Sequence, residues 1–125
     1  MNAATATTAE VTLTVTDNDT AIAHHTGTVP VLATPRVLAL CEEAAVAAIA
    51  PRLAAGETCV GMRAQLDHLV PVRVGSTVRA TATLERVEGR RLTFAVAVND
   101  GCGLVAVGRV TRAIVDVERF LDKAR

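Results

Sequence analysis

The sequence predicts a single α+β domain in which one long helix packs against an antiparallel sheet of five strands. Three observations support this: an N-terminal segment alternates apolar and polar residues, one long segment has helical periodicity, and the remainder alternates again. One helix cannot cover both faces of such a sheet, so we expect the sheet to curl around the helix. A second copy would cover the apolar surface that remains, which favours a homodimer, or a tetramer.

The first strand is predicted where Val11, Leu13 and Val15 alternate with threonines, before the turn-forming residues 17–19. We expect residues 1–9 to form a disordered tail and residues 10–125 to form the domain. Residues 18–33 are predicted to be a long irregular loop. Such a loop is typical of a lid over a binding site, although a plain connector fits equally well.

The helix is predicted over residues 34–53, with Thr34 as its N-cap and Pro35 in the first turn. At about 100° per residue, Arg36 and Glu43 point to the face opposite a stripe of mainly apolar residues. This stripe comprises Leu38, Glu42, Val46, Ile49 and Leu53.

Glu42 is the misfit in this predicted buried stripe. A carboxylate on a buried face costs free energy unless it is ion-paired, hydrogen-bonded or used in chemistry. An ion pair with an arginine across a dimer is the structural alternative to a catalytic role. The functional hypothesis starts from this residue.

Further strands are predicted over residues 58–69, 77–85, 92–98 and 104–117, with turns at residues 88–89 and 99–103. Phe120 and Leu121 are expected to dock a short C-terminal tail. We find no internal repeat and no linker.

The composition excludes several classes of function. Thirteen basic residues balance thirteen acidic ones and only two residues are aromatic, which argues against nucleic-acid binding. The first residues lack the pattern of a signal peptide, and no apolar run approaches the ~20 residues of a membrane span. The three cysteines form no CxxC motif, which predicts reduced thiols in a cytoplasmic protein. No ligand set for a metal is present, because adjacent side chains such as His24 and His25 diverge.

Three polar residues are candidates for catalysis: Thr34, Glu42 and His68. A strand ending at His68 would run beside the helix, which could bring the imidazole near Glu42 of its own chain or of a second copy. A carboxylate and an imidazole in an apolar cleft can activate water, or the carboxylate can attack directly. Each residue also has a purely structural interpretation, as a helix cap, an ion-pair partner or a surface histidine. Cys41 is interpreted as a core residue, since neighbours on a helix point about 100° apart.

Two further residues are candidates for substrate binding. Gly61 in mid-strand indicates a bulge or a close approach of the backbone to a ligand, or room for the helix. Arg112 shares the strand parity of Val110 and Ile114, so we expect it to point inward or into an interface, as a partner of Glu42 or of a phosphate group. Simple surface placement remains an alternative.

The pattern resembles the hot dog fold thioesterases of the fluoroacetyl-CoA thioesterase type, over residues 31–121. The resemblance is carried by Ala33-Thr34-Pro35, by Glu42 eight residues after Thr34, and by His68 twenty-six residues after Glu42. The hairpin residues 87–94 and the closing stretch of residues 108–113 also match.

The resemblance implies a curled sheet around a central helix, in a homodimer with active sites at its interface. The family's catalytic residues would fall on Thr34, Glu42 and His68, a backbone N–H near Gly61 would help to hold the thioester oxygen, and Arg112 would lie near the site. The implied reaction is hydrolysis of an acyl-CoA, or of an acyl-carrier thioester, to a carboxylic acid and a free thiol. Coenzyme A would enter as part of the substrate, and no cofactor is implied.

The loop before the helix departs from the family pattern. The fluoroacetate-selective member has phenylalanines there, whereas His25 and Thr28 occupy the corresponding positions of this chain. We therefore expect a small or medium acyl group other than fluoroacetyl. The alternatives are a non-catalytic acyl-CoA-binding protein and a hydratase or dehydratase on the same fold. The latter ranks last, because Asp67 and His68 are adjacent and point to opposite faces of a strand.

Overall fold

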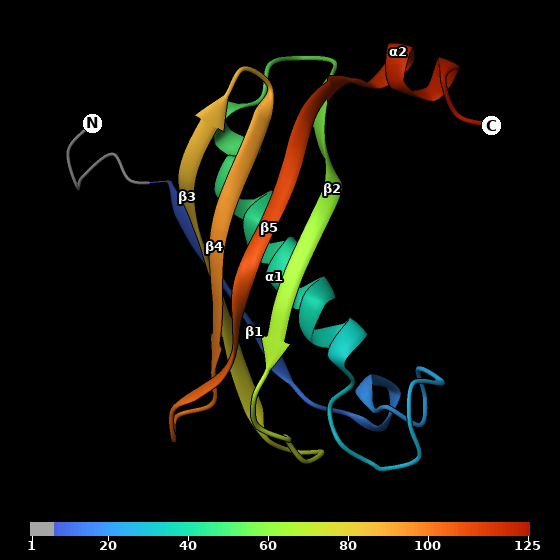
Figure 1. The fold of residues 1–125 in the computed structure, drawn as a ribbon, viewed down its shortest axis with the longest axis vertical. Coiled ribbons are helices and arrows are strands. Elements are labelled where there is room, and N and C mark those ends of the chain that lie inside the picture. The colour runs from blue at the N-terminus through green and yellow to red at the C-terminus, as the bar shows by residue number, and fades with distance from the viewer. Residues whose placement is uncertain (1–6) are drawn as a thin grey trace.

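The computed structural model describes residues 7–125, which form five strands and two α-helices (Figure 1). The strands are β1 (Thr8–Thr14), β2 (Glu57–His68), β3 (Thr77–Glu88), β4 (Arg91–Asn99) and β5 (Leu104–Asp116). The helices are α1 (Thr34–Ile49) and the short C-terminal α2 (Val117–Asp122), with single 3-10 turns at Asp17–Asp19 and Ala50–Arg52.

The five strands form one antiparallel sheet in the order β1-β3-β4-β5-β2. The sheet curls around α1, which crosses its concave face (Figure 1). This arrangement confirms the predicted α+β architecture. No helix among residues 7–125 is long and apolar enough to cross a membrane.

The core lies between α1 and the concave face of the sheet. Alternate residues of β4 point into it, because side chains of a strand face opposite sides in turn. Phe94 is fully buried there and is its largest side chain. The facing surface of α1 is made mainly of small residues, so the helix lies close to the strands. Its buried residues are Val37, Leu40, Cys41, Ala44, Ala45, Ala48 and Ile49.

This buried face differs from the predicted stripe. Ile49 is buried, and Leu38 and Leu53 pack partly against the core, but Val46 is 42% exposed and Glu42 lies at the edge of the covered surface. The prediction was wrong for Glu42 and Val46, because the buried face is centred on Cys41, Ala44, Ala45 and Ala48 and lies to one side of the predicted stripe. The stripe through Leu38, Glu42 and Val46 is therefore incompletely covered by its own chain.

Several predicted boundaries also shift. Thr8 and Ala9 belong to β1, so the strand begins within the segment expected to be a tail, while residues 1–6 lie outside the described residues. The helix ends at Ile49, and the 3-10 turn containing Pro51 follows it. Phe120 and Leu121 lie in α2, and their exposure, 41% and 61%, contradicts the expectation that they dock a tail.

Candidate active site

The start of α1 and the end of β2 bring two of the predicted residues together. Thr34 is the first residue of α1 and His68 the last residue of β2. The Thr34 hydroxyl Oγ1 lies 2.8 Å from His68 Nδ1, a hydrogen bond between residues 34 positions apart. The sequence identified both residues but could not show that they meet.

The prediction that Thr34 caps the helix was wrong. The N-cap is Ala33, which has no side-chain capping bond, and the helical positions begin at Thr34. Because a residue inside the first turn cannot cap the helix that it begins, its hydroxyl is available for another partner. The hydrogen bond with His68 therefore does not compete with a capping bond.

The second ring nitrogen of His68 faces a dry environment. Nε2 is buried and has no hydrogen-bond partner among the described residues. Burial lowers the pKa of His68 below its usual value, because a charged imidazolium is poorly solvated there. The neutral imidazole has two tautomers, so Nδ1 either accepts from the Thr34 hydroxyl or carries the ring hydrogen and donates to Thr34 Oγ1.

A pocket of about 310 Å³ opens beside this pair. Thr34 and His68 line it, together with residues of the loop before α1 and of the segment after β2. Its lining is completed by Ala21, Thr26, Val31, Leu32, Ala33, Leu69, Val70 and Pro71. Most of these residues are apolar, with two hydroxyls and one imidazole among them, a composition typical of small-molecule sites.

Glu42 forms a second polar centre, with Arg112. The guanidinium Nη1 donates to Glu42 Oε1 at 2.9 Å. Arg112 is 7% exposed, which confirms that it points inward. Its other donors are held by one residue of β2, because Nε lies 3.2 Å from Cys59 Sγ and Nη2 lies 3.1 Å from the Cys59 carbonyl oxygen. All three nitrogens of this buried guanidinium are therefore hydrogen-bonded.

Gly61 lies directly against this ion pair. A Cβ atom at this position would come within 2.7 Å of Glu42 Oε1 and 3.5 Å of Arg112 Nη1. The register between β2 and β5 also shifts between Gly61 and Arg63. The alternatives of a bulge and of room for the helix therefore both hold: the glycine leaves space for a carboxylate from α1.

The two polar centres are separate within one chain. Thr34 and Glu42 are eight residues apart on α1, about 12 Å along the axis at ~1.5 Å per residue. No hydrogen bond joins Glu42 to Thr34 or His68 among residues 7–125. His25 and Thr28 lie on the exposed part of the loop, and neither lines the pocket beside His68.

Cys41 matches expectation, whereas the role of Cys59 was not foreseen. Burial raises the pKa of the Cys41 thiol to about 11, as expected for a core residue with no nucleophilic role. Cys59 was not identified as a site residue. Its place two residues before Gly61, and so on the same face of the strand, was the available signal. Within residues 7–125, no group of three potential ligands is placed to bind a metal.

Known proteins with related sequences match most of the chain. The family model described as fluoroacetyl-CoA-specific thioesterase matches residues 15–118. A fluoroacetyl-CoA thioesterase of Streptantibioticus cattleyicolor is 39% identical over 95 residues, which cover 76% of this chain and 68% of that protein.

Solved structures agree with this assignment. A structure of a fluoroacetyl-CoA thioesterase superposes with a TM-score of 0.88 at 31% identity and covers 93% of this chain and 90% of that chain. A thioesterase superfamily member from Thermus thermophilus superposes with a TM-score of 0.85 at 29% identity, covering 93% and 88%. The predicted resemblance is confirmed: this chain has the hot dog fold and belongs to the fluoroacetyl-CoA-specific thioesterase family.

Proposed function

We propose that this protein hydrolyses acyl-CoA thioesters to a carboxylic acid and free coenzyme A. The observation that carries the proposal is the Thr34–His68 hydrogen bond at the edge of an apolar pocket. Family membership supports the reaction class. A protein that only bound acyl groups would need the apolar pocket but not the hydroxyl–imidazole pair.

In this proposal, the Glu42 carboxylate drives the attack on the thioester carbonyl by one of two routes. It either removes a proton from water or attacks directly and forms an anhydride that water then opens. The carbon–sulfur bond breaks, the carbonyl carbon gains an oxygen from water, and the leaving thiolate takes up a proton. Arg112 orients the carboxylate, since its Nη1 donates to one oxygen of Glu42 and leaves the other oxygen without a protein hydrogen bond within residues 7–125.

Because Thr34 and Glu42 lie about 12 Å apart along α1 of one chain, Thr34 and His68 would act on a thioester that is attacked by Glu42 of the partner subunit. A hydroxyl that donates to the developing oxyanion stabilises the transition state, and one good donor contributes roughly 2.7–4 kcal/mol. The neutral His68 supports this role in the tautomer whose Nδ1–H donates to Thr34 Oγ1, because the hydroxyl hydrogen is then free to point at the oxyanion. A backbone N–H near Gly61 is a second candidate donor, close to Glu42.

A homodimer would complete the site. Leu38, Glu42 and Val46 follow one another at intervals of four residues along α1, and Val46 is 42% exposed. An apolar helix stripe that its own sheet leaves uncovered is suited to a second copy of the same stripe about a two-fold axis. The three free cysteines support a reducing, cytoplasmic location.

The acyl group is proposed to be small or medium in size and not specifically fluorinated. The pocket of about 310 Å³ lies at the lower end of the size range for small-molecule sites. No Phe, Tyr or Trp side chain lines it, and the loop that forms its wall contains none, so it lacks a phenyl or indole ring that could close over a small acyl group. Turnover of coenzyme A thioesters compared with that of carrier-protein thioesters identifies the carrier.

The test is a thiol-release assay with acyl-CoAs of increasing chain length, run on the wild-type protein and on Glu42→Gln. We expect turnover to peak at a short or medium chain, and to fall by at least ~100-fold in the variant, as is typical when a general base is lost. Turnover by His68→Ala should fall by a similar factor. Acyl-CoA binding without thiol release by the wild-type protein would instead establish the non-catalytic alternative.

A further inference from the structure

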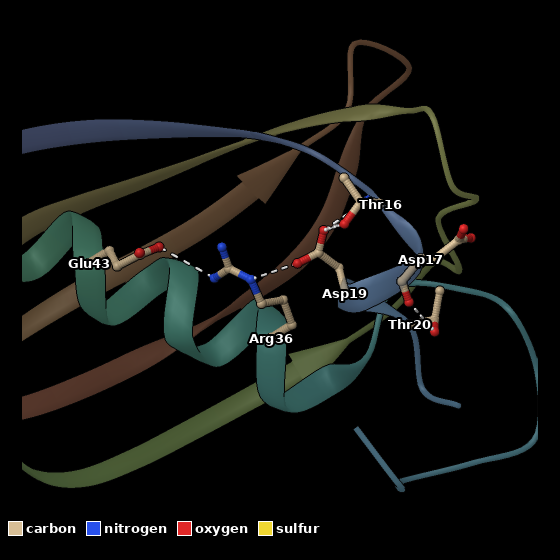
Figure 2. Close-up of polar contacts among 6 residues, drawn as sticks. All are labelled: Thr16, Asp17, Asp19, Thr20, Arg36 and Glu43. Atoms are coloured by element: carbon tan, nitrogen blue, oxygen red, sulfur yellow. Dashed lines mark hydrogen bonds and ion pairs between the residues drawn. The ribbon is translucent and has the colours of Figure 1, made fainter. Parts of the chain in front are cut away.

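Asp19 connects the loop before α1 to the first turn of that helix. It lies in the 3-10 turn after β1 and is only 8% exposed. Its Oδ2 accepts hydrogen bonds from the Thr16 backbone N–H at 2.8 Å and from the Thr16 hydroxyl at 2.9 Å. Its Oδ1 accepts from Arg36 Nε at 3.0 Å. Figure 2 shows this carboxylate between Thr16 and the guanidinium, with Glu43 on the far side of the arginine.

The main chain of Asp19 reaches the residue next to Thr34. The Asp19 carbonyl oxygen accepts a hydrogen bond from the Ala33 N–H at 2.9 Å. Ala33 is the N-cap of α1 and has no side-chain capping bond. The start of the helix is therefore fixed by Asp19 on both sides of Thr34, through Ala33 before it and Arg36 after it.

The same turn also anchors the wall of the pocket beside His68. Thr20 forms a β-bridge with Leu32, and the Ala21 N–H donates to the Val31 carbonyl oxygen at 2.8 Å. Ala21, Val31 and Leu32 all line the pocket. A loop that begins at Asp19 and ends at Thr34 is thus closed at its base by the Asp19–Arg36 pair.

Several observations indicate that the pair is more than an ordinary surface ion pair. The Asp19 side chain is 11% exposed and that of Arg36 is 21% exposed, so solvent screens the interaction weakly. The pKa of Asp19 lies below its usual value even though burial opposes ionisation, because hydrogen bonds from Thr16 and Arg36 favour the carboxylate. Arg36 also contacts Glu43 at 3.4 Å, but that carboxylate is 55% exposed.

We propose that Asp19 and Arg36 are positioning residues for the active site, which act through the first turn of α1 to hold the Thr34 hydroxyl against His68. Neither residue contacts the substrate in this proposal, which rests on the proposed thioesterase function. The loop and the helix start would otherwise be joined mainly by backbone hydrogen bonds at an uncapped helix end.

The test compares Asp19→Asn with Glu43→Gln, which removes only the exposed partner of the same arginine. We expect kcat of Asp19→Asn to fall by about 5- to 20-fold, since sub-ångström displacement of a catalytic group carries a loss of this order. Glu43→Gln should stay within about twofold of the wild type, as for an exposed ion pair. Arg36→Lys, which keeps the charge but not the Nε geometry, gives the same comparison if Asp19→Asn folds poorly.

A double-mutant comparison separates positioning from a general loss of structure. If Asp19 acts through Thr34, then Asp19→Asn should cost less than about twofold when it is added to Thr34→Ala, because interacting residues are not additive. The proposal would be overturned if Asp19→Asn lowered kcat equally in the wild-type and Thr34→Ala backgrounds. It would also be overturned if Glu43→Gln lowered kcat as much as Asp19→Asn does.

A measurement independent of turnover distinguishes failure of this inference from failure of the proposed function. The NMR titration of His68 should move toward the usual histidine pKa in Asp19→Asn and stay unchanged in Glu43→Gln, because a loosened helix start admits water to the ring. Absence of thiol release by the wild-type protein would refute the thioesterase function alone. An unchanged His68 titration in Asp19→Asn would refute the positioning role.

Discussion

Gly61→Ala is a sensitive test of the Glu42–Arg112 centre. The new methyl group would lie 2.7 Å from Glu42 Oε1, whereas ordinary contact begins at 3.4 Å, so the carboxylate must retreat by about 0.7 Å. The backbone of Gly61 does not have a positive φ, so alanine is compatible with the strand. The substitution therefore acts mainly on one flexible side chain.

The expected effects on stability and on turnover differ greatly. The Glu42 side chain is 34% exposed, so weakening its ion pair should cost less than about 1 kcal/mol, which lowers Tm by less than about 5 °C. A displacement approaching 1 Å at a catalytic group can cost as much as ~100-fold, so kcat should fall by about 10- to 100-fold. Loss of activity in a protein that remains folded is the signature of this mechanism.

Thermal unfolding and thiol release measured on the same preparation check this prediction. Gly108→Ala is the contrasting variant, because its Cβ would overlap the Gln65 backbone carbonyl of the neighbouring strand, and backbone cannot yield as a side chain can. We expect that variant to be strongly destabilised. A Gly61→Ala protein with wild-type kcat would show that the position of the Glu42 carboxylate is not critical for the reaction.

Three further predictions concern pH, Arg112 and assembly. Because burial lowers the pKa of His68, the acidic limb of the kcat/KM profile should have its midpoint below pH 6.5. Protonating the buried ring costs free energy, so Tm should also fall as the pH drops from 6.5 through the lowered pKa. An acidic limb with its midpoint above pH 6.5 would contradict this. Cys59→Val removes a hydrogen-bond acceptor from the Arg112 guanidinium and should lower kcat by about 3- to 10-fold, whereas Cys59→Ser keeps an acceptor and should retain most of the activity. Equal activity of the two variants would argue against a role for this hydrogen bond. Val46→Glu places a charge in the exposed stripe of α1 and should halve the particle mass measured by light scattering, while an unchanged mass would exclude that stripe from the interface.

The order and type of the elements were readable from local patterns. Strand alternation depends only on the period of two, and it located β3, β4 and β5 closely. The helical period located α1 along the chain, but it did not identify the face of α1 that packs against the sheet. The sequence suggested that a stripe through Leu38 and Val46 faces the core, whereas the sheet covers a neighbouring face that includes Ala44, Ala45 and Ala48. A helical period alone does not show which of two adjoining apolar faces is covered.

The sequence singled out candidate site residues but not their contacts. Thr34, Glu42, His68, Gly61 and Arg112 stood out as polar or small residues in unusual places, and the family spacing strengthened them. Their partners depend on register and on the packing of α1, which bring together residues 34 to 70 positions apart.

The sequence by itself determined that this is an α+β domain, and it marked a carboxylate, an imidazole and a hydroxyl as candidates for chemistry. Only the tertiary structure decided that the hydroxyl of Thr34 meets His68 instead of capping its helix, and that Cys59 holds Arg112, which in turn holds Glu42. The physical reason is that propensity and periodicity act over a few neighbouring residues, whereas hydrogen bonds between a helix and a distant strand are set by how the whole sheet curls.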